Sequence, residues 1–215
     1  MSLQLPSTVE LELAEQYDRE HAQVCQQVRP DGLFRRLALW REQCLVRRAL
    51  KAAGEPGLVL DMACGAGLFW PVLAEHGNRV ILAADSSQAM LDHARTHHGA
   101  SLLQRIKLFK SSVFSIDLPA NAVDSIFCLQ LFHHVRDSEH RLALLREFHR
   151  VSRDSLIVSV CVGRSATQRH GRPCVAVGRE ELEAQFVLAG FSVFKHYTVL
   201  PGRALGSIYI VRKER

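Results

Sequence analysis

A strand, a glycine-containing loop and a helix follow one another between residues 57 and 76, and this segment constrains the fold most strongly. Gly57 to Met62 is a short apolar run typical of a buried strand, and Leu68 to His76 has the spacing of a helix. The loop between them, Ala63-Cys64-Gly65-Ala66-Gly67, contains glycines that let the backbone turn sharply and approach a ligand closely. The segment therefore predicts an α/β domain with a ligand at the end of its first strand.

The same alternation of short apolar runs and helices continues towards the C-terminus. Further strands are expected at 79–84, 106–110, 123–131, 156–162, 191–199 and 207–211, and further helices at 87–98, 138–151 and 179–189. Strands that alternate with helices in this way form a parallel sheet covered on both faces. The last two strands are separated only by a turn around Pro201-Gly202, so one of them should be antiparallel. Residues 163–178 lack clear periodicity and are expected to form a long loop or a small insertion.

Residues 1–54 precede this alternation and are expected to be helical. Pro30-Asp31-Gly32 should separate two helices, the second of which spans about 33–53 and has one face rich in arginine and lysine. The length of 215 residues and the apolar fraction of 47% suit a single domain with a sizeable core. We therefore expect one domain over 1–215, in which the N-terminal helices accompany an α/β core over 55–215.

Charge and cysteine content limit the environments and partners that this chain can have. The formal net charge of +5 permits an anionic small-molecule partner without requiring nucleic acid. None of the six cysteines forms a Cys-x-x-Cys pair, so neither a zinc site nor a disulfide framework is expected, and scattered thiols suit a reducing cytoplasm. The chain lacks a signal pattern, and no apolar run approaches the ~20 residues that span a bilayer. We therefore expect a cytoplasmic protein without a membrane span.

The residues around the glycine loop indicate which ligand it holds. The third glycine of a dinucleotide-binding Gly-x-Gly-x-x-Gly motif would be Trp70 or Leu68, depending on the alignment, and neither fits that motif. A phosphate-binding Walker loop is excluded because no Gly-Lys-Ser/Thr follows. Asp61 ends the first strand beneath the loop and would repel a pyrophosphate, but it would attract a ligand that carries an ammonium and a sulfonium. S-adenosylmethionine is such a ligand.

A second acidic residue follows the second predicted strand. Asp85 lies 18 residues after Gly67, where a doubly wound fold places a carboxylate that accepts hydrogen bonds from both ribose hydroxyls of a bound nucleoside. The alternative role for such a residue is a helix cap, which Ser86 or Ser87 could also provide. Together with the glycine loop, the position of Asp85 favours the ribose role.

Several further segments, in the right order, resemble the class I methyltransferase superfamily, in particular its UbiE-like, methyltransferase domain 11 group. They are Val59–Gly67, Ala84-Asp85-Ser86-Ser87-Gln88-Ala89-Met90-Leu91, Asp117-Leu118-Pro119, Phe132-His133-His134-Val135 and Arg146-Glu147-Phe148-His149-Arg150-Val151. The resemblance implies a Rossmann-like, doubly wound and mostly parallel sheet of seven strands in the order 3-2-1-4-5-7-6, with strand 7 antiparallel. It also implies an N-terminal helical lid and S-adenosylmethionine as the cofactor of a methyltransferase.

The same resemblance implies which residues contact the cofactor. They are Asp61, Ala63, Cys64, Gly65, Gly67, Asp85, Ser86, Met90, Ser112, Val113, Gln130 and Leu131, with Tyr17 and Arg41 from the N-terminal helices. One position departs from the family pattern, because Ser112 stands where the family often has an aspartate that contacts the adenine amino group. A hydroxyl bonds that amino group more weakly than a carboxylate does.

The residues that face the methyl acceptor are less well defined. His133 and His134 follow the fourth strand, and either can act as the general base or simply pack and cap the next segment. Tyr17 and Trp40 are either part of a lid or ordinary helix-packing residues. The sequence shows no clear set of metal ligands.

Three functions remain open at this point. The leading one is methylation of a small or medium-sized metabolite. The second is methylation of a macromolecule such as RNA, protein or an envelope glycan; the basic helix favours it, whereas the absence of an Asn/Asp-Pro-Pro-Tyr/Phe motif after the fourth strand argues against methylation of base amino groups in RNA. The third is a regulatory protein that binds S-adenosylmethionine with little catalysis, which the Ser112 departure favours.

Overall fold

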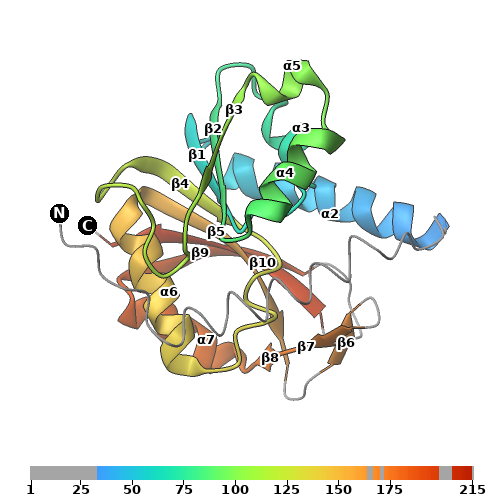
Figure 1. Cartoon of the computed structure of the whole chain (residues 1–215). Helices are drawn as coiled ribbons and strands as arrows, with labels where there is room; N and C mark the ends of the chain where they lie inside the picture. The colour runs from blue at the N-terminus through green and yellow to red at the C-terminus, as the bar shows by residue number, and fades with distance from the viewer. Residues whose placement is uncertain (1–32, 164–166, 170–171, 199–204, 215) are drawn as a thin grey trace.

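The computed structural model describes residues 33–163, 167–169, 172–198 and 205–214 (Figure 1). The expected first helix and Tyr17 lie outside the described residues. The arginine-rich side chains of the segment 164–174 lie outside them as well.

The main sheet has eight strands, seven of which follow the order β3-β2-β1-β4-β5-β10-β9 (Figure 1). β1 to β5 pair in parallel, whereas β10 is antiparallel to both β5 and β9. This is the expected order 3-2-1-4-5-7-6 with a reversed seventh strand, so the predicted fold class is confirmed. The strand bounds are β1 Leu58–Met62, β2 Val80–Asp85, β3 Ile106–Lys110, β4 Val123–Cys128, β5 Ser152–Val162, β9 Phe191–Thr198 and β10 Leu205–Lys213.

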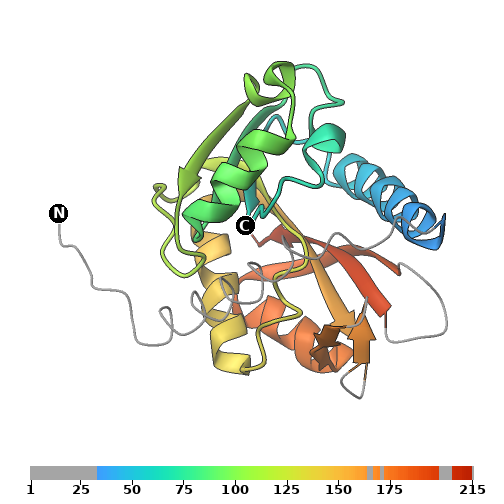
Figure 2. The same cartoon turned by 45° about the vertical axis from the view of Figure 1, so that its right-hand side comes forward.

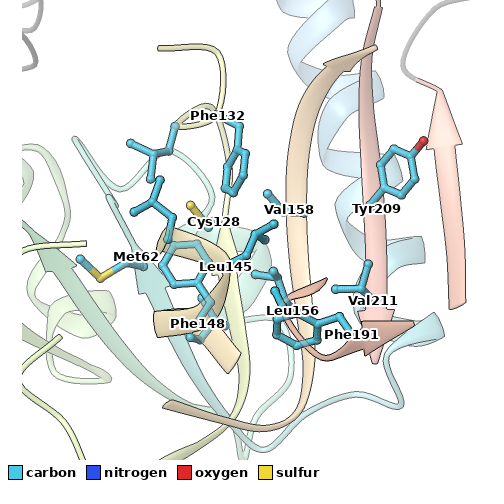
Figure 3. Close-up of a cluster of buried hydrophobic side chains, with 14 of the residues drawn as sticks. Met62, Cys128, Phe132, Leu145, Phe148, Leu156, Val158, Phe191, Tyr209 and Val211 are labelled. Atoms are coloured by element: carbon cyan, nitrogen blue, oxygen red, sulfur yellow. The ribbon is translucent and has the colours of Figure 1, made fainter. Parts of the chain in front are cut away.

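Helices cover both faces of this sheet. Successive side chains along each buried strand point to opposite faces, so each strand contributes to two cores. Ile126 and Cys128 of β4 pack with α6 and α7, whereas Phe127 between them packs with α2 and α3. Figures 1 and 2 show α6 and α7 together on the side away from α2, and Figure 3 shows the core beneath them. The helix bounds are α2 Leu33–Ala52, α3 Trp70–Leu73, α4 Gln88–His97, α5 Ala100–Leu103, α6 Ser138–Val151 and α7 Arg179–Leu188.

Helix α2 differs between its two halves. Its C-terminal half buries Val46, Ala49 and Leu50 against the sheet. Its N-terminal half exposes Leu37 and Trp40, which are 57% and 60% accessible. The expected lid role of the N-terminal helices stays a prediction. Among the described residues, no helix is long and apolar enough to cross a membrane.

The segment after β5 contains three short strands. β6 Thr167–Arg169 and β7 Arg172–Cys174 form an antiparallel hairpin, and β8 Ala176–Val177 pairs in parallel with the end of β5. Of the two alternatives expected for 163–178, a long loop and a small insertion, the small insertion is therefore correct. Strands of two or three residues are too short to leave a periodic pattern in the sequence.

Two local predictions about element length are wrong. The helix expected over 68–76 is limited to the four residues of α3; its start is delayed because Gly67 still has the left-handed φ of the loop, and Pro71 lies in its first turn, where proline is tolerated. The strand expected to reach residue 131 ends at Cys128, and Gln130 then adopts a left-handed φ of 69° that no strand permits.

The expectation of scattered thiols does not hold for every cysteine, because Cys161 in β5 is buried and disulfide-bonded. Cys44, Cys64 and Cys128 are free thiols. Cys161 lies opposite both Ala176 of β8 and Gly206 of β10, so its surroundings come from distant parts of the chain, which Cys-x-x-Cys spacing does not detect.

Candidate functional site

The carboxyl ends of four neighbouring strands meet at one edge of the sheet. Met62 of β1 lies opposite Ala84 of β2, and Asp85 lies opposite Lys110 of β3. On the other side of β1, Asp61 lies opposite Phe127 of β4. The segments that follow these strands therefore share one edge, which is where open α/β sheets bind ligands.

The glycine loop at this edge has an unusual backbone. Ala63, Gly65 and Gly67 have left-handed φ values of 59°, 54° and 71°. Glycine adopts this conformation freely, whereas an alanine loses roughly 1–2 kcal/mol in it. The loop is also anchored to β2, because the Cys64 N–H donates to the carbonyl oxygen of Ala84 at 3.1 Å. Ala63 thus carries strain in a tightly held loop.

Asp85 connects this loop to the start of α4. Its carboxylate is fully buried; Oδ2 accepts a hydrogen bond from the Gly65 N–H at 2.9 Å and Oδ1 accepts one from the Ser87 N–H at 3.0 Å. The cap of α4 is Ser87, whose Oγ accepts from the Met90 N–H at 3.3 Å. Helix capping is therefore the task of Ser87, and the ribose role of Asp85 stays a prediction.

Asp61 is a buried carboxyl group beneath the loop. Its Oδ2 accepts a hydrogen bond from Nε1 of Trp70 at 2.9 Å, and the residue is only 5% exposed. Burial raises the pKa of Asp61 to about 7, the nearby charge of Asp85 adds to the increase, and the hydrogen bond from Trp70 opposes it. This carboxyl group therefore changes its charge near neutral pH.

Trp70 is the main contributor to the site that the sequence interpretation missed. A Cβ atom on Gly67 would lie 2.4 Å from its ring, so the indole fills the space that glycine leaves. In the sequence, Trp70 only excludes a dinucleotide motif. Its spacing of nine residues from Asp61 is not a helical contact, so only the folded loop brings the two together.

The segments after β2 and β3 supply the next predicted contacts. The methyl group of Met90 lies 3.7 Å from the position of a Cβ on Gly65, which places Met90 against the loop. Ser86, Ser112 and Val113 are half-buried, and the Ser112 Oγ accepts a hydrogen bond from the Phe114 N–H at 3.2 Å. The structure thus brings these four residues to the same edge, and their contacts with a cofactor stay predictions.

The segment after β4 carries Gln130 and the two histidines. The Gln130 N–H donates to Oγ of Ser159 at 2.7 Å, which holds the turn against β5. His133 is buried and His134 half-buried, and the His133 carbonyl oxygen accepts a hydrogen bond from the Val175 N–H at 3.2 Å. The insertion after β5 therefore contacts this segment. Leu131 is buried here too, and a role for either histidine in catalysis stays a prediction.

Contacts of Arg41 and Cys64 with the cofactor also stay predictions. Arg41 is exposed on α2. Cys64 is buried, and burial raises the pKa of its thiol well above the ordinary value, so the thiol stays protonated. Within the described part of the chain, no group of three or more His, Cys, Asp or Glu side chains could hold a metal ion.

Two of the segments that carry the family resemblance contact each other. The Glu147 Oε1 atom accepts a hydrogen bond from the Ile116 N–H at 2.7 Å. Arg150 donates to the carbonyl oxygens of Leu118 at 2.8 Å and Ile116 at 2.9 Å. Helix α6 thus holds the segment that contains Asp117-Leu118-Pro119 in place.

Comparison with known proteins gives a consistent result. Residues 59–155 match the model of a methyltransferase domain. Among solved structures, the magnesium protoporphyrin IX methyltransferase (ChlM) of Synechocystis PCC 6803 with bound S-adenosylmethionine shares the fold, with 18% identity, a TM-score of 0.74 and full coverage of both chains. A SAM dependent methyltransferase from Aquifex aeolicus is 25% identical, with a TM-score of 0.59 over 72% of this chain and 81% of that chain. The [4+2]-cyclase SpnF is 18% identical, with a TM-score of 0.67 over 80% of each chain. No curated protein matches the chain.

The site geometry agrees with these comparisons. Two buried carboxyl groups flank a glycine loop at the carboxyl edge, an arrangement that suits a cationic nucleoside ligand better than a phosphate. The matched methyltransferase domain over residues 59–155, the sheet order and this loop support methyl transfer with S-adenosylmethionine as the cofactor, as in the class I S-adenosylmethionine-dependent methyltransferases.

Proposed function

We propose that this enzyme methylates a small or medium-sized metabolite and binds its donor against the glycine loop, between Asp61 and Asp85. The observation that carries the proposal is the position of these two buried carboxyl groups on neighbouring strands beside the loop. A ligand with an ammonium and two ribose hydroxyls offers each carboxyl group a suitable partner. When bound, S-adenosylmethionine supplies an electrophilic methyl group on a sulfonium.

Each residue of the site has a distinct task in this proposal. Asp61 attracts the ammonium of the donor, and Asp85 accepts the ribose hydroxyls while it keeps Gly65 in place. Ser112 hydrogen-bonds the adenine. His133 or His134 takes a proton from the acceptor, if the acceptor still carries one near neutral pH. Much of the remaining rate comes from orienting the acceptor and excluding water.

Two observations support a small acceptor with anionic groups. The Synechocystis enzyme that matches the whole length of this chain is named for a small molecule, magnesium protoporphyrin IX. The formal net charge of +5 also suits an acceptor with anionic groups. The cyclase SpnF has the same fold and a different reaction, so turnover has to be measured directly.

The first experiment is calorimetric titration with S-adenosylmethionine and its demethylated product. Asp85→Ala should weaken donor binding by about 1–3 kcal/mol, as expected for lost hydrogen bonds to hydroxyls. Asp124→Ala is the matched control, because its Oδ2 accepts the Leu58 N–H at 2.8 Å at the start of β1 and β4, the edge opposite the site. Both variants lose a bond to a backbone N–H, but only Asp85→Ala should lose affinity for the donor.

The second experiment identifies the acceptor class. Donor with a labelled methyl group is incubated with the enzyme and a cell extract that is then separated by size. Label in the low-mass fraction supports the proposal. Label only in RNA, protein or glycan favours the macromolecular alternative, and tight donor binding with no transfer to any fraction favours a regulatory protein.

A further inference from the structure

The indole of Trp70 lies at the centre of a group of contacts beneath the glycine loop. Its ring is fully buried and occupies the space beside Gly67, where an added Cβ would lie 2.4 Å away. Its ring centroid is 4.8 Å from that of His98, and Nε2 of His98 is 2.9 Å from the carbonyl oxygen of Ala66. Trp70 and His98 therefore contact the loop at Gly67 and Ala66, whereas Asp85 binds it at Gly65.

The same indole is a hydrogen-bond donor to Asp61. The distance from Nε1 to Oδ2 is 2.9 Å, and both residues are buried. Among the described residues, the titratable groups that interact electrostatically with Asp61 are Asp85 on β2, Cys64 in the loop and Cys128 at the end of β4. One of these groups is an acid and two are thiols, so none of them supplies positive charge. The indole N–H is thus a source of stabilisation for the ionised carboxylate.

We infer that Trp70 is a positioning residue for the donor, which holds the glycine loop in shape and keeps Asp61 oriented towards the donor ammonium. This inference rests on the proposed role of Asp61 in donor binding. An indole N–H that donates to a carboxylate favours the charged form over the neutral form. Loss of the indole therefore weakens donor binding through Asp61.

Donor binding should depend on pH through the carboxyl group of Asp61. Burial raises the pKa of Asp61 to about 7, and the Trp70 hydrogen bond holds it below the value that burial alone would produce. As the pH falls through 7 the carboxylate is protonated, so affinity for a cationic donor should fall. Removing the indole N–H raises the pKa of Asp61 further, and the loss of affinity should then begin at a higher pH.

The first test needs no donor. The chain has two tryptophans, and Trp40 is 60% exposed, so Trp40→Phe leaves Trp70 as the reporter. Its fluorescence should change between pH 5.5 and 8.5 with a midpoint near 7. Asp61→Asn in the same background should remove that change. A pH response unaffected by Asp61→Asn would overturn the inference.

The second test measures binding of S-adenosylmethionine against pH. Trp70→Phe should bind roughly tenfold more weakly at pH 7, as expected for a lost charge-assisted hydrogen bond, and should approach wild-type affinity as the pH rises. Trp40→Phe is the control and should follow the wild type. In the Asp61→Asn background, Trp70→Phe should add little further loss. A uniform loss of affinity at every pH, equally large in the Asp61→Asn background, would show that Trp70 acts by packing alone and would overturn the inference.

The two tests also separate this inference from the proposed function. If the wild type binds no donor at any pH, the proposed function fails, while the fluorescence titration still reports whether Trp70 senses Asp61. If donor binding is normal and the fluorescence change does not depend on Asp61, the proposed function stands and the inference fails. The fluorescence test also retains its force if Trp70→Phe does not fold.

Discussion

The buried carboxyl group of Asp61 should destabilise the folded protein, and the substitution Asp61→Asn should measure the size of this effect. The carboxyl group is 5% exposed, and its pKa is about 7 in the folded chain against an ordinary value of 3.8. The folded state therefore keeps its proton at pH values where the unfolded chain has lost it. The contribution of Asp61 to stability should therefore fall as the pH rises from about 4 to 7 and should then level off. Asparagine does not titrate, and its carbonyl oxygen can still accept the Trp70 N–H.

The size of the effect follows from the two pKa values. One pKa unit corresponds to about 1.4 kcal/mol, so the difference between 3.8 and about 7 sets a ceiling of about 4 kcal/mol. Local relaxation around a buried charge reduces such a value, because the effective dielectric constant exceeds that of a dry interior. We expect Asp61→Asn to raise the free energy of unfolding by roughly 2 kcal/mol at pH 8, and by about 1 kcal/mol or less near pH 4.5.

Urea denaturation without donor, at several pH values between 4.5 and 8, measures this directly. Asp92→Asn is the control, because the Asp92 side chain is 58% exposed on α4, and this variant should stay within about 0.5 kcal/mol of the wild type. The same Asp61→Asn protein should bind S-adenosylmethionine more weakly. An Asp61→Asn protein that is less stable than the wild type at pH 8, or more stable by the same amount at every pH, would refute the reasoning.

Three further substitutions test the contacts around the site by urea denaturation. Ala63→Gly should stabilise the protein by about 0.5–1 kcal/mol, because glycine relieves the left-handed φ of 59° at a smaller entropic cost, whereas Ala66→Gly in the same loop should destabilise it. Gly67→Ala should cost about 2–4 kcal/mol and weaken donor binding, because its Cβ would clash with Trp70 in addition to the strain at a φ of 71°. Arg141→Met should cost about 2–4 kcal/mol, because it removes the hydrogen bonds of a buried guanidinium group. This group donates to the carbonyl oxygens of Val135 and Arg136 and to the side chains of Gln185 and Glu181 on α7.

For each of these three predictions, one result would contradict the reasoning. Equal stability of the Ala63→Gly and Ala66→Gly proteins would mean that Ala63 is not strained. Gly54 has a φ of 88°, and no atom lies within 4 Å of the position of an added Cβ, so Gly54→Ala measures the backbone strain without a clash. If Gly54→Ala lowers the stability as much as Gly67→Ala does, the clash with Trp70 is excluded. Arg146 is exposed on the same helix as Arg141, and a similar loss for Arg146→Met would contradict the role of the buried hydrogen bonds.

The sheet was largely predictable from the sequence because its signal is local. Buried parallel strands appear as short apolar runs between helices, and the lack of a helix between 199 and 207 indicated the antiparallel pair. The short strands β6, β7 and β8 were not predictable as strands, because a pairing such as Val162 with Val177 depends on neighbours in space. The disulfide of Cys161 escaped prediction for the same reason.

For the site, the sequence alone determined the type of ligand and the position of its loop. Asp61, the glycines and Asp85 are spaced so that any fold with this strand order brings them to one edge. Only the tertiary structure decided what each of them contacts. The Asp85 bond to Gly65, the Trp70 bond to Asp61 and the strain at Ala63 arise because the loop folds back over the strand ends, where burial and hydrogen bonds set the energy of each group. Residue types show which charges are available, whereas their free energies depend on surroundings that come from distant parts of the chain.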